Sequence, residues 1–294
     1  MQTKTHFFDF DFDQKESNWG LIALAVIVDA ALLTVAMLVI LPFFKNAFPI
    51  ERFTNGLVGP TLIFSLARFI FVVLGVAMLI GKLRPRDLGL QGKKLSQGAV
   101  VVFGLWILMQ VIGALLHLIA TGKVGLSPIW TPEKIPFIAG GLIAQFLGNA
   151  FAEEVIFRGF LLTQVALLLK GTIIKRGKLL AASILVSQFI FALTHIPQRI
   201  ATGYPLPSML INLVLLWVIG SLFAILYLRT DNIFVVIGIH ALANMPVTVL
   251  ALPSRAVGEL LIYLLALALV FAWGPLMRWI KPEEDSGQSP RFEP

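Results

Sequence analysis

The segment Phe151-Ala-Glu-Glu-Val-Ile-Phe-Arg-Gly-Phe160 places two adjacent carboxylates and an arginine inside an otherwise apolar stretch. A charged side chain at the centre of a bilayer costs roughly 2.5–3.5 kcal/mol on insertion scales, so this cluster of charges requires a reason. Glu154 and Arg158 are four residues apart, so on a helix they share a face and can pair. Glu153 is rotated by about 100° from that face and contacts a different neighbour. We therefore expect one neutralised acid and one free acid.

The composition is that of a membrane protein. The 294 residues are 58% hydrophobic and 13% charged, and the mean hydropathy is +0.89, whereas soluble chains carry about 25% charged residues. The chain has no cysteine, which excludes disulfides, thiolate metal ligands and a cysteine nucleophile. The basic residues that give the net charge of +7 lie mostly in short loops between apolar runs. It is better explained by orientation in a membrane than by a nucleic-acid partner.

Eight apolar runs are long enough to cross a bilayer, at 19–44, 56–81, 96–121, 136–169, 178–196, 205–229, 232–252 and 257–280. The run 136–169 is too long for a hydrocarbon core of about 30 Å, so it overshoots the membrane or breaks near Gly148. These runs predict an all-α polytopic bundle of about eight transmembrane helices over 19–280. A cytoplasmic segment at 1–18 precedes it, and a disordered tail at 281–294 follows.

Lysine and arginine predict the orientation of the bundle. The N-terminus, the loops 82–95, 170–177 and 230–231 and the C-terminus hold 15 basic residues, counting each with its nearest loop. The loops of the other side hold 6, and Arg68 and Arg158 fall inside the membrane. The positive-inside rule therefore places both termini in the cytoplasm.

Three short motifs, each within an apolar run, contain the residues that could perform chemistry. They are Glu153-Glu154-x-x-x-Arg158, Phe191-x-x-x-His195 and His240-x-x-x-Asn244. A carboxylate and an imidazole that face one cavity can polarise a water molecule and remove its proton. A second imidazole and an amide NH₂ can donate hydrogen bonds to the oxyanion that forms when this water attacks a carbonyl. No serine or threonine accompanies an acid–base pair, so direct attack by water fits better than a covalent acyl intermediate.

The same side chains leave a metal site open as an alternative. Glu153, His195 and His240 would make a plausible three-ligand zinc set with one open position. The two histidines are 45 residues apart, so their spacing neither supports nor excludes a divalent metal.

Other polar residues occur within the apolar runs. Gln145, Asn149 and Glu153 follow one another at helical spacing, which predicts either a water path or interhelical hydrogen bonds. Asp29 and Arg68 lie at compatible depths near the middle of two runs, and we expect a structural ion pair rather than a proton relay.

The three motifs in this order resemble the CPBP family, which comprises CAAX prenyl endopeptidases and bacteriocin-processing or self-immunity proteins, including intramembrane proteases. The similar part covers about 136–250, and Pro85-Arg-Asp-Leu-Gly-Leu90 resembles the family's segment ahead of this core. The resemblance implies an eight-helix bundle whose cavity holds the acids and histidines. It implies an intramembrane endopeptidase of the cell membrane of a prokaryote, acting on a membrane-associated peptide or protein.

The resemblance also implies a role for each motif residue. Glu153 would be the base that activates water, assisted by His195, and Glu154 and Arg158 would form a supporting pair. The oxyanion hole would consist of His240 and Asn244. Metal dependence stays open within such a family.

Two other functions remain as alternatives. One is a non-catalytic immunity or partner-binding membrane protein that has kept the motifs. The other is a proton-coupled transporter, against which the chain shows no inverted repeats. For the protease, we expect hydrolysis in the cytoplasmic half of the membrane.

Overall fold

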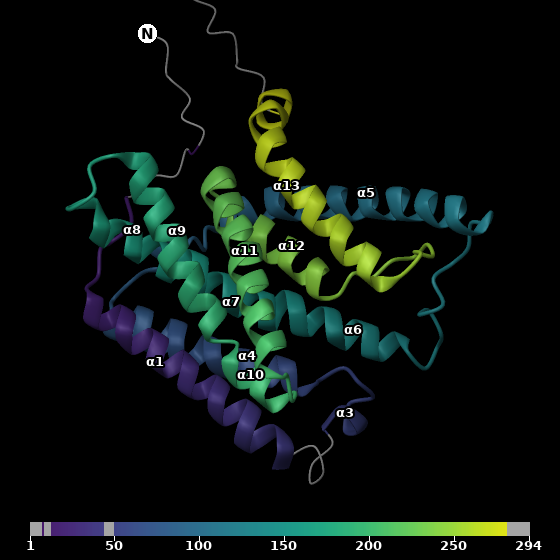
Figure 1. Ribbon diagram of the computed structural model, residues 1–294, viewed down its shortest axis with the longest axis horizontal. Helices are drawn as coiled ribbons and strands as arrows, with labels where there is room; N and C mark the ends of the chain where they lie inside the picture. The colour runs from purple at the N-terminus through teal and green to yellow at the C-terminus, as the bar shows by residue number, and fades with distance from the viewer. Residues whose placement is uncertain (1–7, 9–12, 44–49, 281–294) are drawn as a thin grey trace, which may run out of the picture.

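The computed structural model describes residues 8, 13–43 and 50–280, and the regular elements there are helices (Figure 1). Within these residues, seven helical runs are long and apolar enough to cross a membrane. This confirms the predicted all-α polytopic bundle. The predicted tail at 281–294 and most of the N-terminal segment lie outside the described residues.

The helical runs are built from α-helices and from π- or 3₁₀-helical stretches, which are labelled η. In chain order they are α1 (Trp19–Val35) with η1 (Ala36–Ile40); α4 (Pro60–Arg68) with η2 (Phe69–Ile80); η4 (Gly92–Lys94) with α5 (Leu95–Thr121); α6 (Ile135–Ile143), η5 (Ala144–Asn149), α7 (Ala150–Glu154), η6 (Val155–Leu162) and α8 (Thr163–Lys170); α9 (Arg176–Leu193) with α10 (Ile196–Ala201); α11 (Leu206–Thr230); and α13 (Arg255–Ile280). Shorter elements are α3 (Ile50–Phe53), η3 (Pro85–Leu88) and α12 (Ile233–Asn244).

The long run from Ile135 to Lys170 is one continuous helix of 36 residues. Of the two alternatives, the break near Gly148 is therefore wrong. Gly148 packs closely on α4, where an added Cβ would lie 3.2 Å from Leu62 and 3.4 Å from Ser65. A glycine there serves close helix approach rather than a break.

The predicted eighth span at 232–252 is only partly helical, because α12 ends at Asn244. Met245 precedes Pro246, and a residue before a proline is disfavoured in the helical region. The 12 residues of α12 reach about 18 Å, little more than half of a hydrocarbon core. The chain then continues as an irregular segment, residues 245–254, to the start of α13.

Side chains from α5 satisfy the backbone of this irregular segment. The Gln110 carbonyl accepts hydrogen bonds from the Val249 and Leu250 N–H groups at 2.8 and 3.3 Å. The Trp106 indole donates to the Val247 carbonyl at 2.8 Å. An unpaired backbone group in lipid costs several kcal/mol, so these bonds allow a non-helical chain at this depth.

The irregular segment also pairs with the loop after α5. The Ser127 N–H donates to the Val249 carbonyl at 2.8 Å, and the Ala251 N–H donates to the Gly125 carbonyl at 2.9 Å. Residues 245–254 therefore extend to the end of the molecule at which α5 finishes. Since α12 begins after the loop 231–232, α12 and residues 245–254 together run from one end of the bundle to the other.

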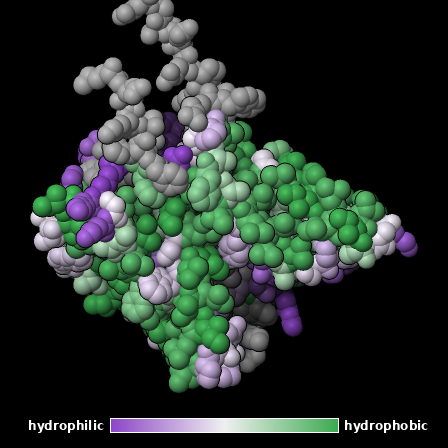
Figure 2. Space-filling view, turned by 45° about the horizontal axis from the view of Figure 1, so that its top comes forward, coloured by the Kyte–Doolittle hydropathy of each residue, from purple (hydrophilic) through white to green (hydrophobic). Residues whose placement is uncertain are grey.

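The lateral surface of the bundle is apolar. Ile27, Leu79, Ile119, Ile211 and Phe271 lie on five different spans, and each side chain is at least 64% exposed. Figure 2 shows apolar residues over most of the visible surface, with hydrophilic residues gathered at the upper left, on the side of α8 and α9. The chain is accordingly an integral, multi-pass membrane protein.

The loops lie at two ends of the bundle. We call one end the basic face, which holds the loops 82–94, 171–175 and 231–232. Its loops contact one another, for example through the Lys94 ammonium and the Asp231 carboxylate, 2.6 Å apart. We call the other end the opposite face, which holds α3, α10 and the loops 54–59, 122–134, 202–205 and 245–254.

Candidate active site

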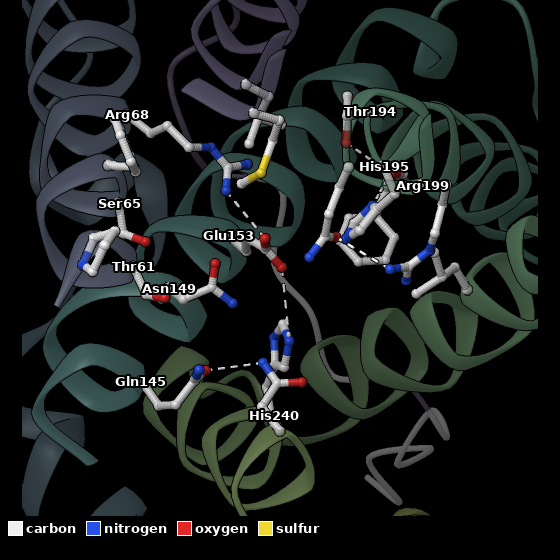
Figure 3. A pocket seen from close by; sticks show the side chains of 18 of the residues that line it. Thr61, Ser65, Arg68, Gln145, Asn149, Glu153, Thr194, His195, Arg199 and His240 are labelled. Carbon is white, nitrogen blue, oxygen red and sulfur yellow. Dashed lines mark hydrogen bonds and ion pairs between the residues drawn. The ribbon is translucent and has the colours of Figure 1, made fainter. Parts of the chain in front are cut away.

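A cavity of about 560 Å³ lies inside the bundle, between α4, the long run from α6 to α8, the junction of α9 and α10, α11 and α12. Four of the predicted site residues line it: Glu153, His195, His240 and Asn244. Figure 3 shows Glu153 near the centre, between Arg68 on one side and His240 on the other. The three motifs, which are far apart in sequence, therefore meet around one space.

Glu154 and Arg158 lie behind the cavity wall and are fully buried. The Arg158 guanidinium donates to the Glu154 carboxylate at 3.0 Å, as their spacing predicts. Arg158 also donates to the Gly220 carbonyl at 3.2 Å and lies 4.5 Å from the centre of the Phe191 ring. This arginine therefore joins the first motif to the second through a cation–π contact.

Glu154 has a second partner that its spacing does not predict. His240 Nδ1 lies 2.6 Å from Glu154 Oε1. An ionised carboxylate only accepts hydrogen bonds, so Nδ1 carries the proton. The other ring nitrogen, Nε2, then points to Glu153 Oε2 at 3.7 Å. Glu154 thus fixes both the orientation and the tautomer of His240.

Glu153 is not the free acid that we expected. Arg68 donates from Nη1 to Glu153 Oε1 at 3.1 Å, and from Nε and Nη2 to the two oxygens of Asp29 at 2.8 and 3.1 Å. The predicted Asp29–Arg68 pair is present, but the five donors of a guanidinium let it reach a second carboxylate. Oε2 of Glu153 accepts no hydrogen bond from the described residues and faces His240.

His195 lies at the junction of α9 and α10, just before Pro197. Its Nδ1 is 2.9 Å from the Phe191 carbonyl oxygen, and the two rings pack edge to face at 4.8 Å. Since a carbonyl only accepts, Nδ1 carries the proton, and in the neutral ring Nε2 keeps its lone pair. The spacing Phe-x-x-x-His thus places a ring acceptor at the cavity.

Asn244 lies at the end of α12, where its side-chain Nδ2 donates to the side-chain Oε1 of Gln145 at 2.9 Å. One amide hydrogen of Asn244 is left for another acceptor. Gln145, Asn149 and Glu153 all line the cavity. The polar stripe along the long helix therefore both borders the cavity and makes an interhelical hydrogen bond.

The cavity includes a further charged residue that the sequence did not single out. Arg199 lies on α10, four residues after His195, and its Nε donates to the side-chain Oδ1 of Asn212 at 2.6 Å. Its guanidinium also lies 5.4 Å from the centre of the Tyr204 ring. In the sequence, only its helical spacing from His195 could have indicated that Arg199 lines the same cavity.

The three side chains named as a zinc set, Glu153, His195 and His240, all line the cavity. Among the described residues, no group of three or more His, Cys, Asp or Glu side chains is placed so that it could hold an ion. One oxygen of Glu153 is bound by Arg68, and Nδ1 of His240 by Glu154. Metal dependence stays a prediction for experiment.

Comparison with known proteins identifies the segment that holds the site. Residues 135–246 match the family model described as Rce1-like, type II CAAX prenyl endopeptidase. No match is found among curated proteins or among solved structures. Asp29 and Arg68 lie outside the matched segment. The predicted resemblance is confirmed: over residues 135–246, which contain all three motifs, this chain is similar to the Rce1-like family of type II CAAX prenyl endopeptidases.

Proposed function

We propose that this protein is an intramembrane endopeptidase that hydrolyses a peptide bond of a membrane-associated substrate by direct attack of water. One observation carries the proposal: Glu153 Oε2 faces the cavity beside His240, while Arg68 holds the other oxygen of the same carboxylate. A carboxylate held in this way has one oxygen for structure and one for chemistry. The match to the Rce1-like family supports the same activity class.

In this mechanism, Glu153 Oε2 accepts a proton from the attacking water. His195 Nε2 is an acceptor at the same cavity and orients the water's second hydrogen. The new bond joins the water oxygen to the carbonyl carbon of the substrate, and the carbonyl oxygen becomes an oxyanion. Glu153 then returns its proton to the leaving amine nitrogen as the C–N bond breaks.

The oxyanion needs donors that are already in place. Asn244 has one amide hydrogen beyond the one that Gln145 binds. His240 donates from Nε2 when its ring is the imidazolium, whose charge Glu154 balances from the Nδ1 side. Neutral His240 would present a lone pair there instead. The proposed oxyanion hole therefore requires protonated His240.

The remaining wall of the cavity is suited to an apolar substrate segment. Leu33, Met37, Phe64, Leu216 and Ile219 line it alongside the polar groups. Such side chains bury an apolar segment, while the polar groups fix the orientation of the peptide bond.

The test uses protein in liposomes and a panel of membrane-tethered peptides. Glu153→Gln and His195→Ala should each lower kcat by about 10²–10⁴-fold, the usual contribution of a general base. Glu133→Gln, on the exposed loop before α6, and His117→Ala, on α5 away from the cavity, are the matched controls and should keep the wild-type rate. Cleavage that survives Glu153→Gln contradicts the proposal. A cellular phenotype that survives it would favour the partner-binding alternative.

A further inference from the structure

The rim of the cavity lies on the opposite face. Its outermost residues are Glu51 on α3, Thr61 in the first turn of α4 and Arg199 on α10, and each is exposed or half-exposed. Figure 3 shows Thr61 and Arg199 on two sides of Glu153. Among the described residues that line the cavity, none belongs to the loops 82–94, 171–175 or 231–232. The cavity therefore borders the opposite face and not the basic face.

Between Glu153 and the basic face the bundle is closed by close packing. The side chains of Arg158 and Leu88 are 0% exposed, and that of Phe157 is 1% exposed. Gly159 lies against the Leu88 carbonyl oxygen so closely that an added Cβ would collide with it. Neither water nor a peptide can cross this layer without moving backbone.

The two faces differ in charge. Of the lysine and arginine side chains that the structure describes, 11 lie at the basic face and 5 at the opposite face, with Arg68 and Arg158 inside the bundle. With α12 and residues 245–254 as the eighth crossing, both ends of the described bundle lie at the basic face. The positive-inside rule assigns such a face to the cytoplasm.

We propose that the cavity opens to the non-cytoplasmic side of the membrane, and that its substrate is a segment of an exported or membrane-inserted polypeptide presented from that side. The substrate part rests on the proposed protease function, whereas the sidedness does not. It reverses the expectation of hydrolysis in the cytoplasmic half, because the motif positions alone do not give the direction in which a cavity opens. The water for hydrolysis enters through the same mouth.

The absence of cysteine allows a direct test of sidedness. Gly92→Cys on the basic face and Thr202→Cys on the opposite face are neutral changes at exposed positions, and a Cβ at Gly92 meets no atom within 4 Å. A membrane-impermeant maleimide is applied to bacterial spheroplasts that express each variant, before and after lysis. Thr202→Cys should be labelled before lysis, and Gly92→Cys only after it. Labelling of Gly92→Cys before lysis, or of Thr202→Cys only after lysis, overturns the proposal.

A second measurement separates the access side from the activity. A peptide cleaved by the liposome-embedded protein is added to sealed right-side-out and inside-out membrane vesicles. Right-side-out vesicles should cleave at least tenfold faster, and detergent should abolish the difference. Faster cleavage by inside-out vesicles contradicts the access side. If no peptide is cleaved in any preparation while the labelling pattern holds, the protease function fails and the sidedness stands. Glu153→Gln provides the inactive control, and when combined with Gly92→Cys or Thr202→Cys it should give the same labelling as that cysteine variant alone.

Discussion

At the scale of single residues, Arg68 is the side chain on which the geometry of the site depends most. Its planar guanidinium binds both oxygens of Asp29 and one oxygen of Glu153, and all three side chains are buried. An arginine in such a position is held by one carboxylate and in turn holds another. We therefore regard Arg68 as a positioning residue for Glu153.

The first prediction concerns Arg68→Lys. Lysine keeps the positive charge but lacks the planar guanidinium with its several N–H donors. It therefore cannot bind Asp29 at two points and also reach Glu153. We expect kcat to fall by about 10²-fold, the usual effect of a small misplacement at a reacting group, with KM nearly unchanged. Arg52→Lys on α3 is the matched control. In Arg68→Ala, added guanidinium should restore part of the rate, whereas Glu153→Gln should gain nothing. Equal kcat values for Arg68→Lys and wild type would show that Arg68 has no positioning role.

The residues also show what a sequence can and cannot predict here. The Glu154–Arg158 pair followed from helical spacing, because both residues lie on one helix. The bond from Arg68 to Glu153 depends on how α4 is rotated against α7, and no local pattern contains that angle. The same holds for His240 and Glu154, which are 86 residues apart. Contacts within a helix followed from spacing. Between helices, depth predicted the Asp29–Arg68 pair, whereas the contacts that orient Glu153 and His240 could not be predicted.

At the scale of elements, the irregular segment 245–254 differs most from expectation. Its hydropathy is that of a span, and only Pro246 and Pro253 indicated that the helix would stop. The site requires this stop, because Asn244 is the last residue of α12. The long run from Ile135 to Lys170 differs in the other direction, since it continues through a glycine that suggested a break.

The second prediction concerns Gln110→Leu. This change removes the acceptor of the Val249 and Leu250 N–H groups, each of which then costs about 1–3 kcal/mol if buried without a partner. We expect a lower melting temperature in detergent and a lower kcat, because Asn244 loses its support. Gln91→Leu, at the start of η4, is the control and should melt as wild type does. An unchanged melting temperature for Gln110→Leu would mean that other groups satisfy this backbone.

At the scale of the whole molecule, Asp87 joins the chain before α1 to the loop between the second and third spans. It accepts hydrogen bonds from the Arg84 N–H at 2.8 Å and from the Lys15 N–H at 3.4 Å. Burial alone would raise the pKa of Asp87, but these N–H donors outweigh burial and hold the pKa below its ordinary value. The ionised form therefore stabilises the basic face.

The third prediction follows from the direction of this shift. A carboxyl group with a lowered pKa contributes stability above its unfolded pKa of about 3.9, and the contribution is lost as pH falls through the folded pKa. At pH 7, Asp87→Asn should therefore unfold more easily than wild type by about 1–2 kcal/mol. The difference should shrink below about pH 4. Thermal melts of both proteins from pH 7 to pH 3 measure it, with Asp13→Asn as the exposed control. A difference that is constant with pH would exclude the ionised carboxylate as its cause.

The segment that resembles known endopeptidases is smaller than the part of the chain that forms the candidate active site. Residues 135–246 contain every motif, yet the cation beside Glu153 comes from α4 and its counter-charge from α1, both outside that segment. A chimaera that grafts only the matched segment onto another bundle would carry a complete signature and an unsupported glutamate. In this protein the charged pair that holds Glu153 in place, Asp29 with Arg68, lies on two helices that the match does not cover.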